Sequence, residues 1–202
     1  HYLTLDTKGN GHGKRWDYRL GMDFYLGKKH QLSAIYNGNH RKGYDHTVME
    51  GTVTSDKMMT GTRTLHNVKT DYQSSFGLSA GMDFLFYTSP TEESIRSSLQ
   101  GVENTFNNRN NQRINRLLFY ANQTHALKNG TNLNYGFQYT NTHDNSYQTY
   151  FDPTTGEAIP DQSSKDLRKE YVLNLYAGAS HSFSNHLSGE VSLASELYDA
   201  RG

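Results

Sequence analysis

The 202-residue chain contains no cysteine, which excludes disulfide bonds and thiolate chemistry. Its 20 basic and 20 acidic residues balance, so it lacks the basic excess on which nucleic-acid binding depends. Because no run of about 18 consecutive apolar residues occurs, a transmembrane helix is not expected. Only 3 prolines accompany 18 glycines, a composition that suits strands and tight turns better than rigid linkers.

Apolar residues are also scarce, at 34% of the chain, and the mean hydropathy is −0.85. Soluble globular domains contain about 45–50% apolar residues by a related count. Disorder would explain the deficit, but 12% aromatic residues are too many for a disordered chain. A barrel with a polar interior explains both observations, because one face of each strand is then apolar.

Alternation of apolar and polar residues is the clearest pattern present, and residues 15–26 read RWDYRLGMDFYL. Successive side chains on a strand point to opposite faces, and about 9–11 tilted residues cross a bilayer. Residues 76–87 and 133–140 repeat the pattern. The side chains expected to face lipid are Trp16, Leu20, Met22, Phe24, Leu78, Met82 and Phe84. Those expected to face the lumen are Asp17, Arg19, Asp23 and Asp83.

Short and long connections between these strand patterns alternate. Short turns are expected at residues 27–30, 128–130 and 184–186, where Asn129-Gly130 is the strongest hairpin signal. Long polar loops are expected at His40–Thr62, Ser89–Gln112 and Asp152–Lys165. In outer-membrane barrels the short turns face the periplasm, so these three loops are expected at the cell surface, carrying any substrate contact.

The fold class expected is therefore all-β: an antiparallel up-and-down meander that forms part of a transmembrane outer-membrane β-barrel. Parity requires two strands within residues 63–88, with a turn near 72–76. The count is then about eight strands beginning at Trp16, after a turn at Asp6–Gly13, with a possible ninth at residues 1–5. We interpret residues 1–202 as one segment of a larger barrel.

Two hairpins resemble a known family. Residues 18–40 (YRLGMDFYLGKKHQLSAIYNGNH) and 117–139 (LLFYANQTHALKNGTNLNYGFQY) are similar to barrel hairpins of Bacteroidetes outer-membrane proteins of the TonB-dependent receptor type. The resemblance implies a barrel of about 22 strands with a plugged lumen. It also implies uptake of a nutrient, and partners outside this segment: a plug domain, a periplasmic energy-coupling protein and outer-membrane lipid. The identity of the nutrient stays open.

No catalytic, cofactor or metal site is expected, and the chain is not expected to be an enzyme. Its ten histidines lack HExxH spacing or a cysteine partner, which favours solvated side chains over metal ligands. Asp17 and Asp23, with Arg19 between them, are interpreted as a charged lumen wall with Asp–Arg pairing rather than as catalytic carboxylates. No Gly-x-Ser-x-Gly nucleophile motif occurs.

Residues 135–151 (YGFQYTNTHDNSYQTYF) are rich in tyrosine. Most of these rings are expected in an interfacial girdle or in strand packing. Tyr147, Tyr150 and Phe151 are the candidates for ligand contact in an extracellular loop. The alternative to a receptor or transporter barrel is a soluble β-sandwich or adhesin-like binding module, which would bury its apolar face.

Overall fold

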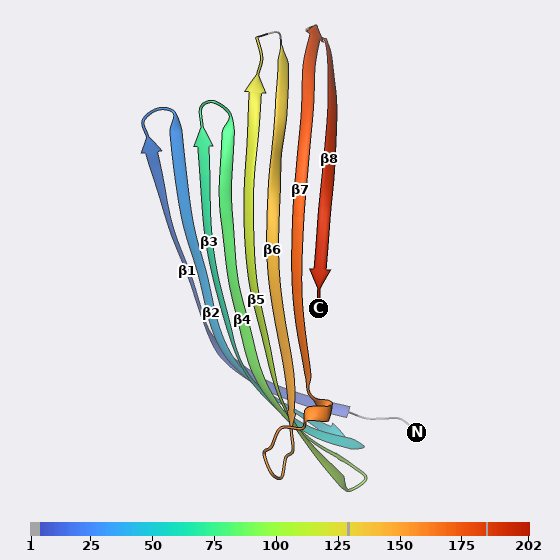
Figure 1. Ribbon diagram of the computed structural model, residues 1–202. Coiled ribbons are helices and arrows are strands. Elements are labelled where there is room, and N and C mark those ends of the chain that lie inside the picture. Colours follow the sequence, from blue (N-terminus) through green and yellow to red (C-terminus); the bar gives the residue numbers. More distant parts are fainter. Residues whose placement is uncertain (1–4, 129, 185) are drawn as a thin grey trace.

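The computed structural model describes residues 5–128, 130–184 and 186–202, and it is all-β. Eight strands pair antiparallel with their sequence neighbours in one sheet, which confirms the expected all-β, up-and-down meander (Figure 1). The elements are β1 (Leu5–Leu26), β2 (His30–Gly51), β3 (Val53–Ser74), β4 (Leu78–Leu99), β5 (Val102–Ala126), β6 (Thr131–Phe151), the short 3-10 helix η1 (Pro160–Gln162), β7 (Ser164–Ser184) and β8 (Leu187–Arg201).

The sheet is a single layer. Among the described residues no hydrophobic side chain is buried, and no second sheet packs on either face. A β-sandwich requires two sheets with interdigitating inner faces. The soluble sandwich considered from the sequence is therefore not what these strands form.

Two of the three expected long loops are instead paired strand. His40–Thr62 continues β2 and β3 around a turn at Thr52, and Ser89–Gln112 continues β4 and β5 around Gln100-Gly101. The prediction was wrong because alternation of apolar and polar residues marks only strands that have one apolar face, and these segments lack it. A strand with water on both faces can be polar throughout and still complete its hydrogen-bond ladder. Residues 152–163 do form a loop between β6 and β7.

The opposite end of the sheet carries short turns, as expected. The turn expected near residues 72–76 lies at residues 75–77, between β3 and β4. Gly77 has a φ of 92° there, and the Leu78 amide donates to Ser74 Oγ at 3.0 Å. Asn129 and Asn185 lie outside the described residues, as does the possible ninth strand at residues 1–5 apart from Leu5, which belongs to β1. The expected turn at Asp6–Gly13 was wrong, because these residues pair with β2 as part of β1.

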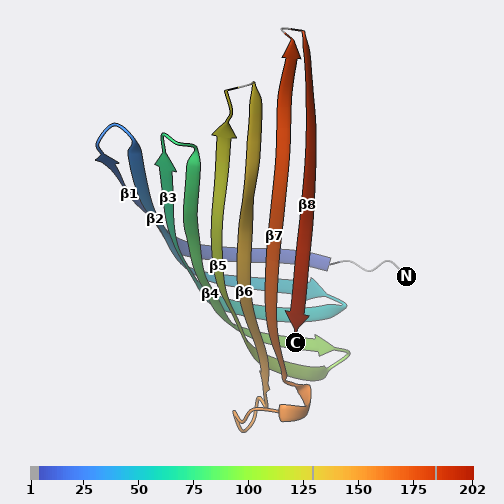
Figure 2. The same cartoon turned by 45° about the horizontal axis from the view of Figure 1, so that its top comes forward.

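β1–β4 bend near their middles, and their lower halves turn to the right in both views (Figures 1 and 2). Gly13, Gly43 and Gly61 pair across this middle region of β1, β2 and β3. A Cβ on Gly13 would lie 3.0 Å from the carbonyl oxygen of Lys42. In β4 the neighbouring Pro90 supplies no N–H to the ladder. Missing side chains and a missing donor together allow the sheet to curve.

Candidate functional site

The register sorts the side chains onto two faces, because cross-strand partners share a face and sequence neighbours do not. All seven expected lipid-facing residues share one face, here called the apolar face. Asp17, Arg19, Asp23 and Asp83 share the other, here called the polar face. One row of the apolar face contains Met22, Ala34, Thr70, Met82, Phe119, Tyr139, Leu173 and Leu197. Contact with lipid or lumen stays a prediction.

Three consecutive rows of the apolar face, those through Leu20, Met22 and Phe24, are here called the apolar belt. Across β1–β7 these rows contain no charged side chain. Leu20 is 69% exposed and Met22 is 63% exposed. Monomeric soluble proteins rarely expose a continuous apolar surface of this extent, which therefore marks an interaction surface.

Aromatic side chains border the belt at both ends. At the end away from the short turns, ring contacts connect Tyr18 to Tyr36, Tyr36 to His66 and His66 to Phe86. At the end near the turns, His30 contacts both Tyr72 and Phe76, and His125 contacts Tyr135. Aromatic girdles at both interfaces flank the apolar band of outer-membrane barrels.

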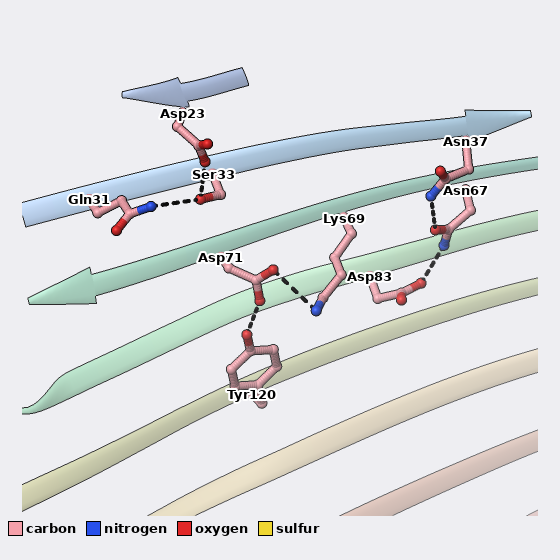
Figure 3. Close-up of polar contacts among 9 residues, drawn as sticks. All are labelled: Asp23, Gln31, Ser33, Asn37, Asn67, Lys69, Asp71, Asp83 and Tyr120. Atoms are coloured by element: carbon pink, nitrogen blue, oxygen red, sulfur yellow. Dashed lines mark hydrogen bonds and ion pairs between the residues drawn. The ribbon is translucent and has the colours of Figure 1, made fainter. Parts of the chain in front are cut away.

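The polar face carries a network of hydrogen bonds and ion pairs (Figure 3). Ser33 Oγ donates to Asp23 Oδ1 at 2.5 Å, and Asn67 Nδ2 donates to Asp83 Oδ1 at 2.6 Å. Asp71 forms an ion pair with Lys69 at 3.1 Å and accepts a hydrogen bond from the Tyr120 hydroxyl. Neighbouring side chains thus supply hydrogen bonds or ion pairs to each of these carboxylates, which indicates a structural role for them.

Asp17 is paired in the same manner, but not with the expected arginine. Its partner is Arg15, at 2.7 Å, and Asn39 Nδ2 also donates to it at 2.5 Å. Arg19 forms no ion pair with any described residue. Arg15 and Asp17 are on the same strand face, so a separation of two residues is enough for contact.

A second polar cluster lies beyond the belt, where the sequence suggested a loop. Lys57 forms an ion pair with Glu93, and Asn108 Nδ2 donates to Glu93 Oε2 at 3.1 Å. The hydrogen bond from Lys57 is the main cause that lowers the pKa of Glu93, and Asn108 lowers it further. Asn108, 7% exposed, is the one buried polar side chain among the described residues. No periodicity in the sequence marks this cluster, so sequence reasoning missed it.

Tyr150 joins this cluster on the polar face. It pairs with Asn108 in the register and contacts the ring of Phe106 edge-on, with the centroids 4.9 Å apart. Gln148 Nε2 donates to the Tyr150 hydroxyl at 2.5 Å. An aromatic ring, an amide and a paired carboxylate therefore meet on one polar surface, a combination suited to binding a polar ligand.

Tyr147 and Phe151 do not share that surface. All three candidate contact residues lie in β6, not in a loop, and the period of two places Tyr147 and Phe151 on the opposite face from Tyr150. Lys165 Nζ lies 5.7 Å from the centroid of the Tyr147 ring, and the Arg109 guanidinium carbon lies 5.5 Å from that of Phe151. The sequence grouped three residues that the strand separates.

The loop that follows β6 is held by local contacts. Asp152 Oδ1 accepts the backbone amides of Thr154 and Thr155 at 2.7 and 3.0 Å, and these hydrogen bonds lower the pKa of Asp152. Beside the loop is an open hollow of about 430 Å³ whose lining includes Phe151 and Gly156.

The described residues contain no candidate metal site. Among these residues no three His, Asp or Glu side chains lie close enough together to hold an ion. The same part of the chain contains no helix long and apolar enough to cross a bilayer.

No family model matches the chain, and no curated protein does. Solved structures with a similar arrangement of strands include the ferripyoverdine receptor of the Pseudomonas aeruginosa outer membrane, with a TM-score of 0.46, 10% identity, and coverage of 100% of this chain and 38% of that one. The translocator domain of the Neisseria meningitidis autotransporter NalP has a TM-score of 0.27 and 11% identity over 97% of this chain and 84% of its own. The ferric citrate transporter FecA has a TM-score of 0.27 and 10% identity, over 93% of this chain and 41% of its own.

Proposed function

We propose that this chain forms part of the wall of an outer-membrane β-barrel that takes up a nutrient in a TonB-dependent manner. The observation that carries the proposal is a single-layer sheet with an apolar belt, uncharged across β1–β7, on one face and a hydrogen-bonded polar network on the other. In lipid, a wall of this kind keeps its backbone groups paired and turns its apolar side chains outward.

The nutrient-uptake part of the proposal rests on the resemblance of residues 18–40 and 117–139 to TonB-dependent receptors. The proposed partners are a plug domain and a periplasmic energy-coupling protein, and both lie outside this segment. No enzymatic activity is assigned to this segment, because the carboxylates of the polar face are bound to neighbouring side chains.

Within this function, the polar surface around Tyr150, Asn108 and Glu93 is the proposed ligand contact. Its side chains project from strands, so they hold fixed positions above the lumen. Tyr147 provides a matched control three residues away on the opposite face.

The membrane assignment is tested by site-directed spin labelling in lipid. Because the chain contains no cysteine, each of the single substitutions Met82→Cys and Asp83→Cys gives one labelling site. The label at residue 82 is expected to be accessible to oxygen and shielded from a water-soluble nickel chelate, and the label at residue 83 the reverse. Equal accessibility at the two positions would refute the barrel wall.

The ligand surface is tested by uptake. Growth of a deletion strain on single nutrient sources identifies the nutrient, and uptake is then measured with Tyr150→Ala and Tyr147→Ala. We expect Tyr150→Ala to reduce uptake at least tenfold, which corresponds to a loss of about 1.4 kcal/mol of binding free energy. We expect Tyr147→Ala to leave uptake near the original rate. Equal effects would remove Tyr150 from the ligand surface.

A further inference from the structure

Unpaired cations are concentrated on the apolar face just beyond the belt, on the side away from the short turns. They project from the three rows through Tyr18, Trp16 and Lys14. These rows contain no Asp or Glu among the described residues. The cations, here called the basic band, are Lys14, Lys42, Arg113, Lys165 and Lys169.

The five side chains of the basic band have no acidic partner. None forms an ion pair with any described residue, and all five are exposed. The neighbouring cation Arg201 differs, because it is paired with Asp199 at 2.8 Å. Lys14 and Lys42 are direct cross-strand partners. Like charges placed directly opposite one another destabilise a sheet, so an external anion would relieve this arrangement.

The band is continuous with the aromatic border of the belt. The Arg113 guanidinium carbon lies 5.3 Å from the centroid of the Phe86 ring, which belongs to that border. Lys165 lies over Tyr147 in the same way. Long basic side chains at the edge of an apolar surface rest their stems on it and extend their charges toward the headgroup layer.

We propose that the basic band binds the phosphate groups of a phosphorylated glycolipid in the outer leaflet of the outer membrane. The inference rests on the proposed membrane function, because it requires the apolar belt to face lipid. The band lies on the side where the strands extend past the belt, and in outer-membrane barrels that side is extracellular. Each cation near an anionic lipid surface is expected to tighten binding about fivefold.

The polar face offers a matched control at a similar height. Arg19, Arg41 and Arg63 carry the same charge and form no ion pair with a described residue, but the register turns them to the opposite face. Removing three cations from either face changes the net charge of the protein equally.

The test uses the protein purified from outer membranes in neutral detergent, titrated with lipid A at low salt. For Lys14→Gln/Lys42→Gln/Arg113→Gln we expect the dissociation constant to rise on the order of a hundredfold. For Arg19→Gln/Arg41→Gln/Arg63→Gln we expect it to stay within about threefold. Replacing Lys14 and Lys42 by Arg, with Arg113 by Lys, should preserve binding because it preserves the charges.

Two further arms identify the source of the phosphate. Dephosphorylated lipid A should bind the unaltered protein as weakly as lipid A binds the first triple variant. Inorganic phosphate at the same concentration should not displace lipid A. Displacement by inorganic phosphate, or equal losses in the two triple variants, would overturn the proposal. Spin-label accessibility at residues 82 and 83 separates this failure from failure of the membrane function, since it does not depend on the basic band.

Discussion

At the scale of single residues, three tyrosines lie across glycines of a neighbouring strand. Tyr18 covers Gly38, Tyr120 covers Gly81, and Tyr176 approaches Gly136. In each pair the glycine lacks the side chain that would occupy the space of the ring. Aromatic rings that cover cross-strand glycines restore packing where the glycine contributes none.

Gly81→Ala is therefore expected to destabilise the sheet. Its Cβ would lie 2.5 Å from the backbone oxygen of Thr70 and 2.6 Å from the Tyr120 hydroxyl, so backbone must move. We expect a loss of about 1–3 kcal/mol in a urea unfolding titration in lipid. Gly21→Ala is the control, because its nearest contacts lie at an ordinary 3.8 Å. Equal losses would mean that the close approach of Tyr120 has no energetic effect.

Glu93 gives the region beyond the belt a sensitivity to acid. The pKa of Glu93 in the folded protein lies below the ordinary value of 4.5. Its contribution to folding stability is therefore complete above pH 4.5 and is lost as the pH falls through the lower pKa of the folded state. The contribution to stability is limited to about 1 kcal/mol, because the side chain of Lys57 is 44% exposed and solvent screens the ion pair. Amide exchange in β3 and β4 should accelerate in acid, and Glu93→Gln should reduce that pH dependence. Identical pH profiles for the two proteins would contradict this role.

At the scale of elements, each of the strands β1–β7 has one half within the belt region and one half beyond it, and the sequence patterns of the two halves differ. Met22→Arg should cost about 2–4 kcal/mol in a membrane-refolding titration, because it places a charge at the middle of the apolar belt. Asp23→Asn should cost far less, since an amide oxygen still accepts the hydrogen bond from Ser33. Similar costs at the two positions would contradict the assignment of the faces.

The halves within the belt could be predicted from sequence because their environments differ from face to face. That difference selects Leu20, Met22 and Phe24 on one side and Asp23 on the other. The halves beyond the belt could not, because water on both faces imposes no alternation on residues such as Asn107 or Thr60. Tyr150 was a candidate from the sequence, but its grouping with Glu93 and Asn108 could not be predicted, because it depends on long-range register, which no local pattern reports.

At the scale of the whole molecule, the two ends of the sheet differ in what they expose. One end has short turns, and the other carries the loop at residues 152–163. Proteinase K added to intact cells should cut within residues 152–163 and spare the turns at 27–29 and 75–77, which become accessible after permeabilisation. Cleavage of intact cells at Lys28 would invert the topology.

The extension of paired strand past the belt has a consequence for how specificity changes in this protein. A binding surface made of flexible loops changes its selectivity through insertions, deletions and altered loop shape, and it loses conformational entropy when a ligand orders it. Tyr150 and Asn108 are instead fixed by a continuous hydrogen-bond ladder. Their surface is already ordered before a ligand arrives, so little entropy is lost on binding. Selectivity would then change one inward-facing side chain at a time, at every second position of a strand whose length stays constant.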